Sequence, residues 1–63
     1  MKSSITDIDV LIVHQTERAV LVKADEDADG VWLPLSQVEV DGESGGYGVV
    51  TLPVWLAEEK ELV

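Results

Sequence analysis

The stretch AVLVKADEDADGVWLPL, residues 19–35, decides the fold that the sequence predicts. Its two ends are rich in valine, leucine and tryptophan, and β-branched and aromatic residues favour strands. Its middle, DEDADG, has the aspartates and the glycine that hairpin turns prefer. We therefore predict an antiparallel hairpin with strands at residues 19–24 and 31–35. Pro34 cannot donate a ladder hydrogen bond, so the second strand should end at an edge or a bend of the sheet.

Two further strands are expected outside this hairpin. Residues 8–16, IDVLIVHQT, alternate in polarity near their ends and are apolar on both faces in the middle. Residues 49–52 form a last short strand before the C-terminal segment. One alternating face of the first strand is predicted to carry the side chains of Ile8, Val10, Ile12 and His14.

Shorter elements fill the remaining sequence. Residues 36–39, SQVE, have the spacing of a helix capping box and predict a single helical turn, after which residues 39–41 briefly resume strand. Pro53 suits a first helical turn, and the good helix formers after it predict a C-terminal helix of about ten residues. The chain should thus be mainly β (β+α), with about four strands. Two forms stay open, a small curved antiparallel sheet or a half-open SH3-like or OB-like barrel, each with a short C-terminal helix.

Length and composition describe one small domain, residues 1–63. Within it, residues 1–6 are predicted to be flexible, and residues 41–48, DGESGGYG, to form a flexible glycine-rich loop. A chain of this size usually needs support beyond its core. Cysteine is absent, which excludes disulfides and zinc–thiolate sites. Tight packing, oligomerisation or an oxygen-ligated metal remain as supports, so a homodimer is one alternative.

The charge balance restricts the partners. Thirteen acidic residues against four basic ones give a formal net charge of −9, which repels a phosphate backbone. Direct nucleic-acid binding is therefore not expected, and a protein with a basic surface is the expected partner. No apolar run reaches the roughly 20 residues that a membrane span needs. We expect a cytoplasmic location in a bacterial host and no membrane partner.

The acidic turn also invites comparison with a calcium loop. Asp25, Asp27, Asp29 and Gly30 match the first half of an EF-hand loop, but its twelfth position, a bidentate glutamate, falls on Ser36. A calcium site on the three aspartates is the alternative to a solvated turn, and we predict the turn, with no metal and no other cofactor. The densest negative patch of the sequence nevertheless lies here. A basic partner is expected to contact Asp25, Glu26, Asp27 and Asp29.

Other residue types that carry chemistry are few, and no catalytic residue is assigned. His14 is the only histidine, so no second imidazole is present to build a metal site with it. Trp32 and Trp55 have two interpretations that remain open. Both can anchor the core by packing the third strand against the helix, or at least one can be exposed at the centre of a protein interface.

Two segments, VWLPLSQVEV and LPVWLAEEKEL, carry a resemblance to a known group. They resemble small proteins encoded by tailed phages, prophages and other mobile elements, whose shared pattern is an alanine-rich β-strand, an acidic turn, then V-W-x-P-x-S-Q, and finally P-x-W-L-A-E-x-K. The similarity covers residues 17–62. The matching positions are Ala19, Val31, Trp32, Pro34, Ser36, Gln37, Pro53, Trp55, Leu56, Ala57, Glu58 and Lys60.

The order of elements is also similar to the dimeric single-strand-binding fold of the PC4 coactivator, whose groove is basic where this chain is acidic. From charge and resemblance together we expect a non-enzymatic, acidic protein-interaction module of phage or mobile-element origin. One form of it is an inhibitor that mimics nucleic-acid charge, of the anti-CRISPR or anti-restriction type. The alternatives are a PC4-like single-stranded nucleic-acid-binding protein and a small calcium-binding domain.

Overall fold

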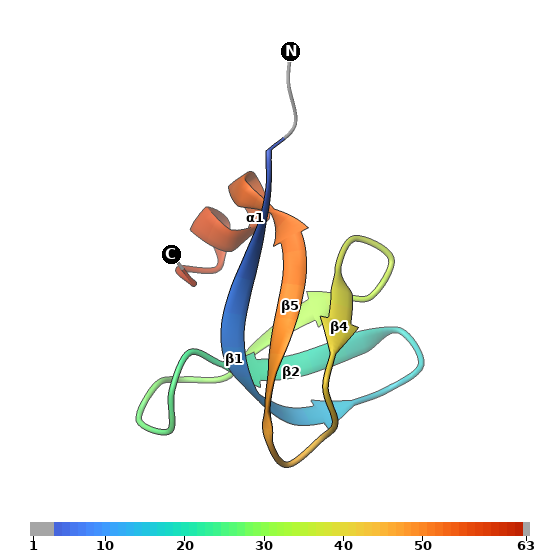
Figure 1. The fold of residues 1–63 in the computed structure, drawn as a ribbon, viewed down its shortest axis with the longest axis vertical. Helices are drawn as coiled ribbons and strands as arrows, with labels where there is room; N and C mark the ends of the chain where they lie inside the picture. The colour runs from blue at the N-terminus through green and yellow to red at the C-terminus, as the bar shows by residue number, and fades with distance from the viewer. Residues whose placement is uncertain (1–3, 63) are drawn as a thin grey trace.

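Residues 4–62 are described by a computed structural model, in which five antiparallel strands form one curved, unclosed sheet beside a short helix (Figure 1). The order of strands across the sheet is β3-β2-β1-β5-β4. The predicted mainly β fold and the β2–β3 hairpin are confirmed, and β3, which ends in Pro34, lies at an edge of the sheet. In chain order the elements are β1 (Ile5–Gln15), β2 (Ala19–Lys23), β3 (Val31–Pro34), β4 (Glu39–Asp41), β5 (Tyr47–Pro53) and α1 (Val54–Glu59).

Strand β1 joins the two halves of the sheet. Its N-terminal part pairs with β5, and from Leu11 onward it pairs with β2. A bulge between Ile12 and His14 inserts Val13 as an extra residue. A bulge bends its strand, and in Figure 1 β2 and β3 run across behind β5. The extra residue also shifts the alternation by one, so the prediction that His14 shares the inner face is wrong, and its side chain is exposed.

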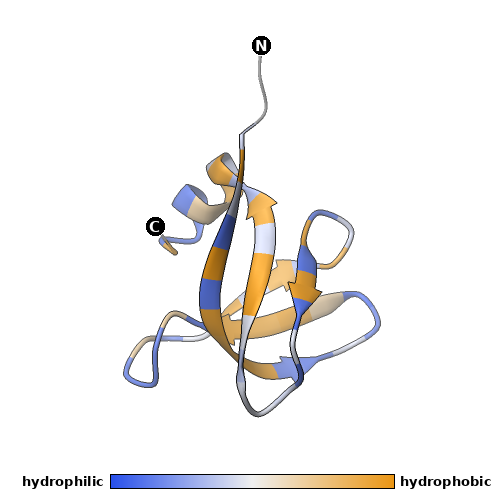
Figure 2. Cartoon of the chain, in the orientation of Figure 1, coloured by the Kyte–Doolittle hydropathy of each residue, from blue (hydrophilic) through white to orange (hydrophobic). Residues whose placement is uncertain are grey.

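The core is aliphatic and lies on the concave side of the sheet, under α1 at one end. Strand residues supply most of it, as the apolar bands on the strands show (Figure 2). Neither tryptophan belongs to the core, because Trp32 is 48% exposed and Trp55 is 55% exposed. Of the two interpretations of the tryptophans, the one in which they anchor the core is therefore wrong. The buried residues are Val10, Ile12, Val20, Val22, Leu33, Val38, Val50, Leu52, Leu56 and Ala57.

The segment after β3 differs from the predicted helical turn. The Gln37 N–H donates to the Pro34 carbonyl (3.0 Å), which closes a tight turn, and Glu39 is already the first residue of β4. Val38 buries its side chain in the core, and Val40 pairs with Val50 of β5. Burial of two alternate valines and pairing with β5 outweigh the local capping signal.

Helix α1 is shorter than predicted because its C-terminus closes early. Glu61 has a left-handed backbone (φ 60°), the Leu62 N–H donates to the Ala57 carbonyl (2.8 Å), and the Glu61 N–H donates to the Glu58 carbonyl (3.1 Å). These bonds form a Schellman motif, which satisfies the last carbonyls of a helix. The turn brings Leu62 against the core.

The two segments predicted to be flexible contain strand residues in the structure. Strand β1 begins at Ile5, within residues 1–6, because Ile5 and Thr6 pair with the end of β5. Residues 1–3 lie outside the described part of the chain. The glycine-rich segment 41–48 contributes Asp41 to β4 and its last two residues to β5. Among residues 4–62, no helix is long and apolar enough to cross a membrane.

Candidate protein-binding face

Four carboxylates line up on the outer face of the sheet, the face opposite the core. Strand register places Asp7 beside Thr51, which is beside Glu39, and places Asp9 beside Val49, which is beside Asp41. All four acidic side chains are exposed, while Val10, Val40 and Val50, which alternate with them along the strands, face the core. We call Asp7, Asp9, Glu39 and Asp41 the acidic rows.

Strand geometry gives the spacing of the acidic rows. The backbone positions of acids two residues apart on one strand are separated by about 7 Å, and those across the intervening β5 by about 10 Å. The hydroxyl of Thr51 donates a hydrogen bond to Asp7 Oδ1 (2.6 Å), which orients that carboxylate. Strand pairing thus holds the backbones of all four acids, and one hydrogen bond adds a side-chain constraint at Asp7.

Apolar side chains continue the outer face on both sides of the acidic rows. At one end, Ile5, 67% exposed, pairs with Pro53. At the other end, Leu11 lies between Tyr47 and Lys23 in the register. Tyr47 is 58% exposed and lines a shallow hollow of about 500 Å³ with Asp9, Gly48 and Val49. Tyrosine is among the residues enriched at protein interfaces, whose rims are polar.

A second aromatic group lies beyond the bulge. Leu21 pairs with both His14 and Trp32, so the three side chains form a row across β1, β2 and β3. The rings of His14 and Trp32 meet edge to face, with their centroids 6.4 Å apart and an interplanar angle of 89°. This contact gives the exposed histidine a packing partner.

The acidic turn predicted as the first contact site forms the tip of the β2–β3 hairpin. Asp25 Oδ1 accepts the Asp27 N–H (2.8 Å), and the Asp25 carbonyl accepts the Ala28 N–H (3.2 Å). Lys23 Nζ donates to the Glu26 carbonyl (3.0 Å). The side chains of Asp25, Glu26, Asp27 and Asp29 are exposed, and one of the carboxylates stabilises the turn itself.

The turn aspartates are not gathered around a common point. Within residues 4–62, no group of three or more His, Cys, Asp or Glu side chains is placed to hold a metal ion. The calcium interpretation of Asp25, Asp27 and Asp29 therefore gains no support from their geometry.

The remaining sequence candidate, Trp55, lies on α1 with its side chain exposed. It is two residues after Pro53 and beside the buried Leu56. The structure records an aromatic contact between Trp32 and His14, with Trp55 taking no part in it. Trp32 and Trp55 thus lie on different elements of the fold as two separate exposed aromatic residues.

Sequence reasoning missed the acidic rows. A local signal exists, because acidic and apolar residues alternate in TDIDV (Asp7, Asp9) and in EVD (Glu39, Asp41). Such alternation places the acids of each segment on one face of a strand. The two pairs are 30 or more residues apart in the chain. Only the pairing of both strands with β5 brings them onto one surface.

Comparison of the chain with protein-family models, with curated proteins and with solved structures finds no match. A functional conclusion has to rest on the arrangement of the side chains.

Proposed function

We propose that the chain is a non-enzymatic interaction module that binds a basic protein surface through the acidic rows. The observation that carries this proposal is the strand register, which sets four exposed carboxylates on β1 and β4, with only Thr51 and Val49 of the intervening β5 between them. No basic residue interrupts the rows in that register. A partner with lysine or arginine side chains at matching spacing would neutralise them.

Folding brings together four negative charges that repel one another. Two unit charges about 10 Å apart in water repel by about 0.4 kcal/mol, and closer neighbours repel by more. The repulsion is small for each pair of charges. It still lowers the stability of a domain that is only marginally stable because it is small. Binding to a positive surface removes the repulsion, and complementary charge also accelerates association.

The partner that we propose is a nucleic-acid-binding protein, because its binding channel supplies dense positive charge. In this form of the proposal the acidic rows occupy positions that phosphates would take. The exposed Tyr47 beside the rows adds an aromatic contact of the kind that dominates interface energies. The resemblance of VWLPLSQ and PVWLAEEK to phage and mobile-element proteins supports a target in a bacterial cytoplasm, such as a restriction or CRISPR component.

Two variants with matched charge provide the test. The sheet variant carries Asp7→Asn, Asp9→Asn, Glu39→Gln and Asp41→Asn. The loop variant carries Asp25→Asn, Glu26→Gln, Asp27→Asn and Asp29→Asn. Each removes four of the thirteen acidic charges.

The experiment is affinity capture from a bacterial lysate on immobilised wild type, sheet variant and loop variant. We expect wild type and loop variant to retain the same nucleic-acid-binding proteins, duplex DNA to elute them, and the sheet variant to lose them. Retention of the same proteins by the sheet variant would refute the proposal. Direct retention of a single-stranded DNA probe by the purified protein would favour a nucleic-acid-binding function instead.

A further inference from the structure

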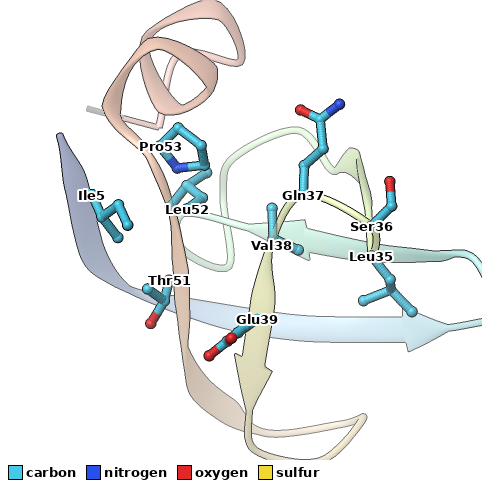
Figure 3. Close-up of a pocket in the computed structure, with 9 residues that line it drawn as sticks. All are labelled: Ile5, Leu35, Ser36, Gln37, Val38, Glu39, Thr51, Leu52 and Pro53. Carbon is cyan, nitrogen blue, oxygen red and sulfur yellow. The ribbon is translucent and has the colours of Figure 1, made fainter. Parts of the chain in front are cut away.

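A groove of about 450 Å³ opens beside the acidic rows, between the end of β5 and the turn that follows β3 (Figure 3). Its size is in the range of about 300–1,000 Å³ that ligand pockets occupy. We call it the β5 groove. Its lining residues are Ile5, Leu35, Ser36, Gln37, Val38, Glu39, Thr51, Leu52 and Pro53.

The β5 groove exists because the β4–β5 ladder stops at a proline. The Val54 N–H donates to the Ser4 carbonyl on the β1 side (2.9 Å). Successive peptide groups of a strand point in opposite directions, so Pro53 faces the β4 side, where it has no N–H to donate. The last pair of the ladder is accordingly Glu39 with Thr51. Beyond that pair the two segments separate, and Figure 3 shows the opening between them.

The floor and walls of the β5 groove are apolar. Leu52 and Val38, which are buried, form its floor, and the half-buried Leu35 and Pro53 form its walls. In the described part of the chain, no buried side-chain nitrogen or oxygen lacks a hydrogen-bond partner. The floor therefore offers no unpaired polar side-chain atom to a ligand, and its aliphatic side chains suit an apolar side chain.

The rim of the β5 groove belongs partly to the acidic rows. Glu39 and Thr51 line the groove, and both belong to the row of side chains that runs from Glu39 across Thr51 to Asp7. A ligand segment that places an apolar side chain on Leu52 therefore places its next residues within reach of carboxylates. Charge complementarity requires those residues to be basic.

We infer that the β5 groove receives one apolar side chain of the partner, from an extended segment in which lysine or arginine flanks that residue. The inference rests on the proposed function, because the flanking positive charges contact the acidic rows. The apolar side chain is then the buried anchor of the interface, and the acidic rows form charged contacts around it.

Two capped synthetic peptides serve as probes in a titration followed by amide chemical shifts of the ¹⁵N-labelled protein. One peptide contains only lysine and glycine, and the other has a leucine in place of the central glycine. We expect both to shift residues of the acidic rows, and only the leucine peptide to shift Leu35, Val38 and Leu52. Burying the leucine should tighten binding about tenfold.

A matched pair of variants tests the β5 groove itself. Ser36→Trp adds an indole at the exposed rim of the groove, whereas Ser44→Trp adds the same group at an exposed position in the loop between β4 and β5. Ser36→Trp should remove the tenfold advantage of the leucine peptide and leave binding of the lysine–glycine peptide unchanged. Ser44→Trp should leave both affinities unchanged.

The outcomes separate the two proposals. Failure of both peptides to shift the acidic rows would overturn the proposed function together with this inference. Shifts in the rows with equal affinity for both peptides would overturn the inference alone. The inference would also be overturned if the chemical shifts of the groove residues changed with protein concentration and not with peptide concentration. A second copy of the chain would then be the occupant.

Discussion

The hairpin tip and the acidic rows each carry four carboxylates, and they differ in how the chain holds them. Asp25, Glu26, Asp27 and Asp29 are neighbours in sequence, on a turn closed by hydrogen bonds between residues two and three apart. The acidic rows come from β1 and β4, and their spacing is set by pairing with β5 over 44 residues of separation between Asp7 and Thr51. The tip is a local structure, and the rows are a product of the whole sheet.

The difference matters for recognition. Charged side chains on a short turn lose conformational freedom when they bind, which reduces the affinity gained per contact. Side chains on paired strands have their backbones in place before the partner arrives. The two regions carry equal charge but are expected to bind unequally.

The largest expected effect comes from Gly48→Ala, which disrupts the hairpin that presents Asp41. A Cβ at Gly48 would lie 2.5 Å from the Asp41 carbonyl oxygen and 2.6 Å from Ile12 Cδ1. Overpacking of this kind costs about 1–3 kcal/mol, and the backbone contact argues for the upper end. Urea unfolding should show a loss of about 3 kcal/mol.

Gly46→Ala is the control for that change. A Cβ at Gly46 meets only the Glu43 carbonyl oxygen, at 4.0 Å. Its urea midpoint should remain within error of wild type. Equal destabilisation by both substitutions would mean that glycine flexibility, and not the close approach at Gly48, explains the result.

A smaller effect is expected at the hairpin tip. Asp25→Ala removes the acceptor for the Asp27 N–H and should lower the free energy of unfolding by about 1 kcal/mol. Asp25→Asn keeps an oxygen at that position and should restore most of the loss, because asparagine forms the same turn. The melting temperatures of the two variants test this expectation. If Asp25→Asn melts as low as Asp25→Ala, charge and not the hydrogen bond stabilises the turn.

The smallest effect should follow Thr51→Val in the acidic rows. The change removes the hydroxyl that donates to Asp7 and keeps a β-branched side chain, so stability should change by about 0.5 kcal/mol or less. Affinity for the lysine–glycine peptide should fall about twofold, because the Asp7 carboxylate is no longer oriented. Calorimetric titration measures the affinity of both proteins for this peptide. An unchanged affinity would show that the orientation of Asp7 does not contribute to binding.

Much of the fold follows from local pattern. The valine, leucine and tryptophan residues of segments 19–24 and 31–35 and the turn residues between them suffice to predict the β2–β3 hairpin, and Pro34 places its end at a sheet edge. Helix formers after Pro53 predict α1. Its early end does not follow from the sequence, because Glu61 adopts a left-handed conformation that glycine usually supplies.

The candidate binding face is harder to predict because it depends on strand register. The bulge at Val13 turns His14 outward, and no local feature of IDVLIVHQT marks it. The strand Glu39–Asp41 has only three residues and follows a sequence that favours a helical turn. Its pairing with β5, which places Glu39 beside Thr51, cannot be predicted from these few residues. Trp32 alternates with the buried Leu33 along β3, and Trp55 precedes the buried Leu56 on α1, so both indoles are exposed and the core is aliphatic.

The most direct measurement is the affinity of the lysine–glycine peptide for wild type, sheet variant and loop variant, by calorimetric titration at low ionic strength. Loss of four contacts to carboxylates held by the sheet should weaken binding by the sheet variant about tenfold or more, at about 0.3–1 kcal/mol for each contact. The loop variant, which has the same net charge, should bind nearly as well as wild type. Equal weakening of both variants would contradict the account, because net charge alone would then explain binding.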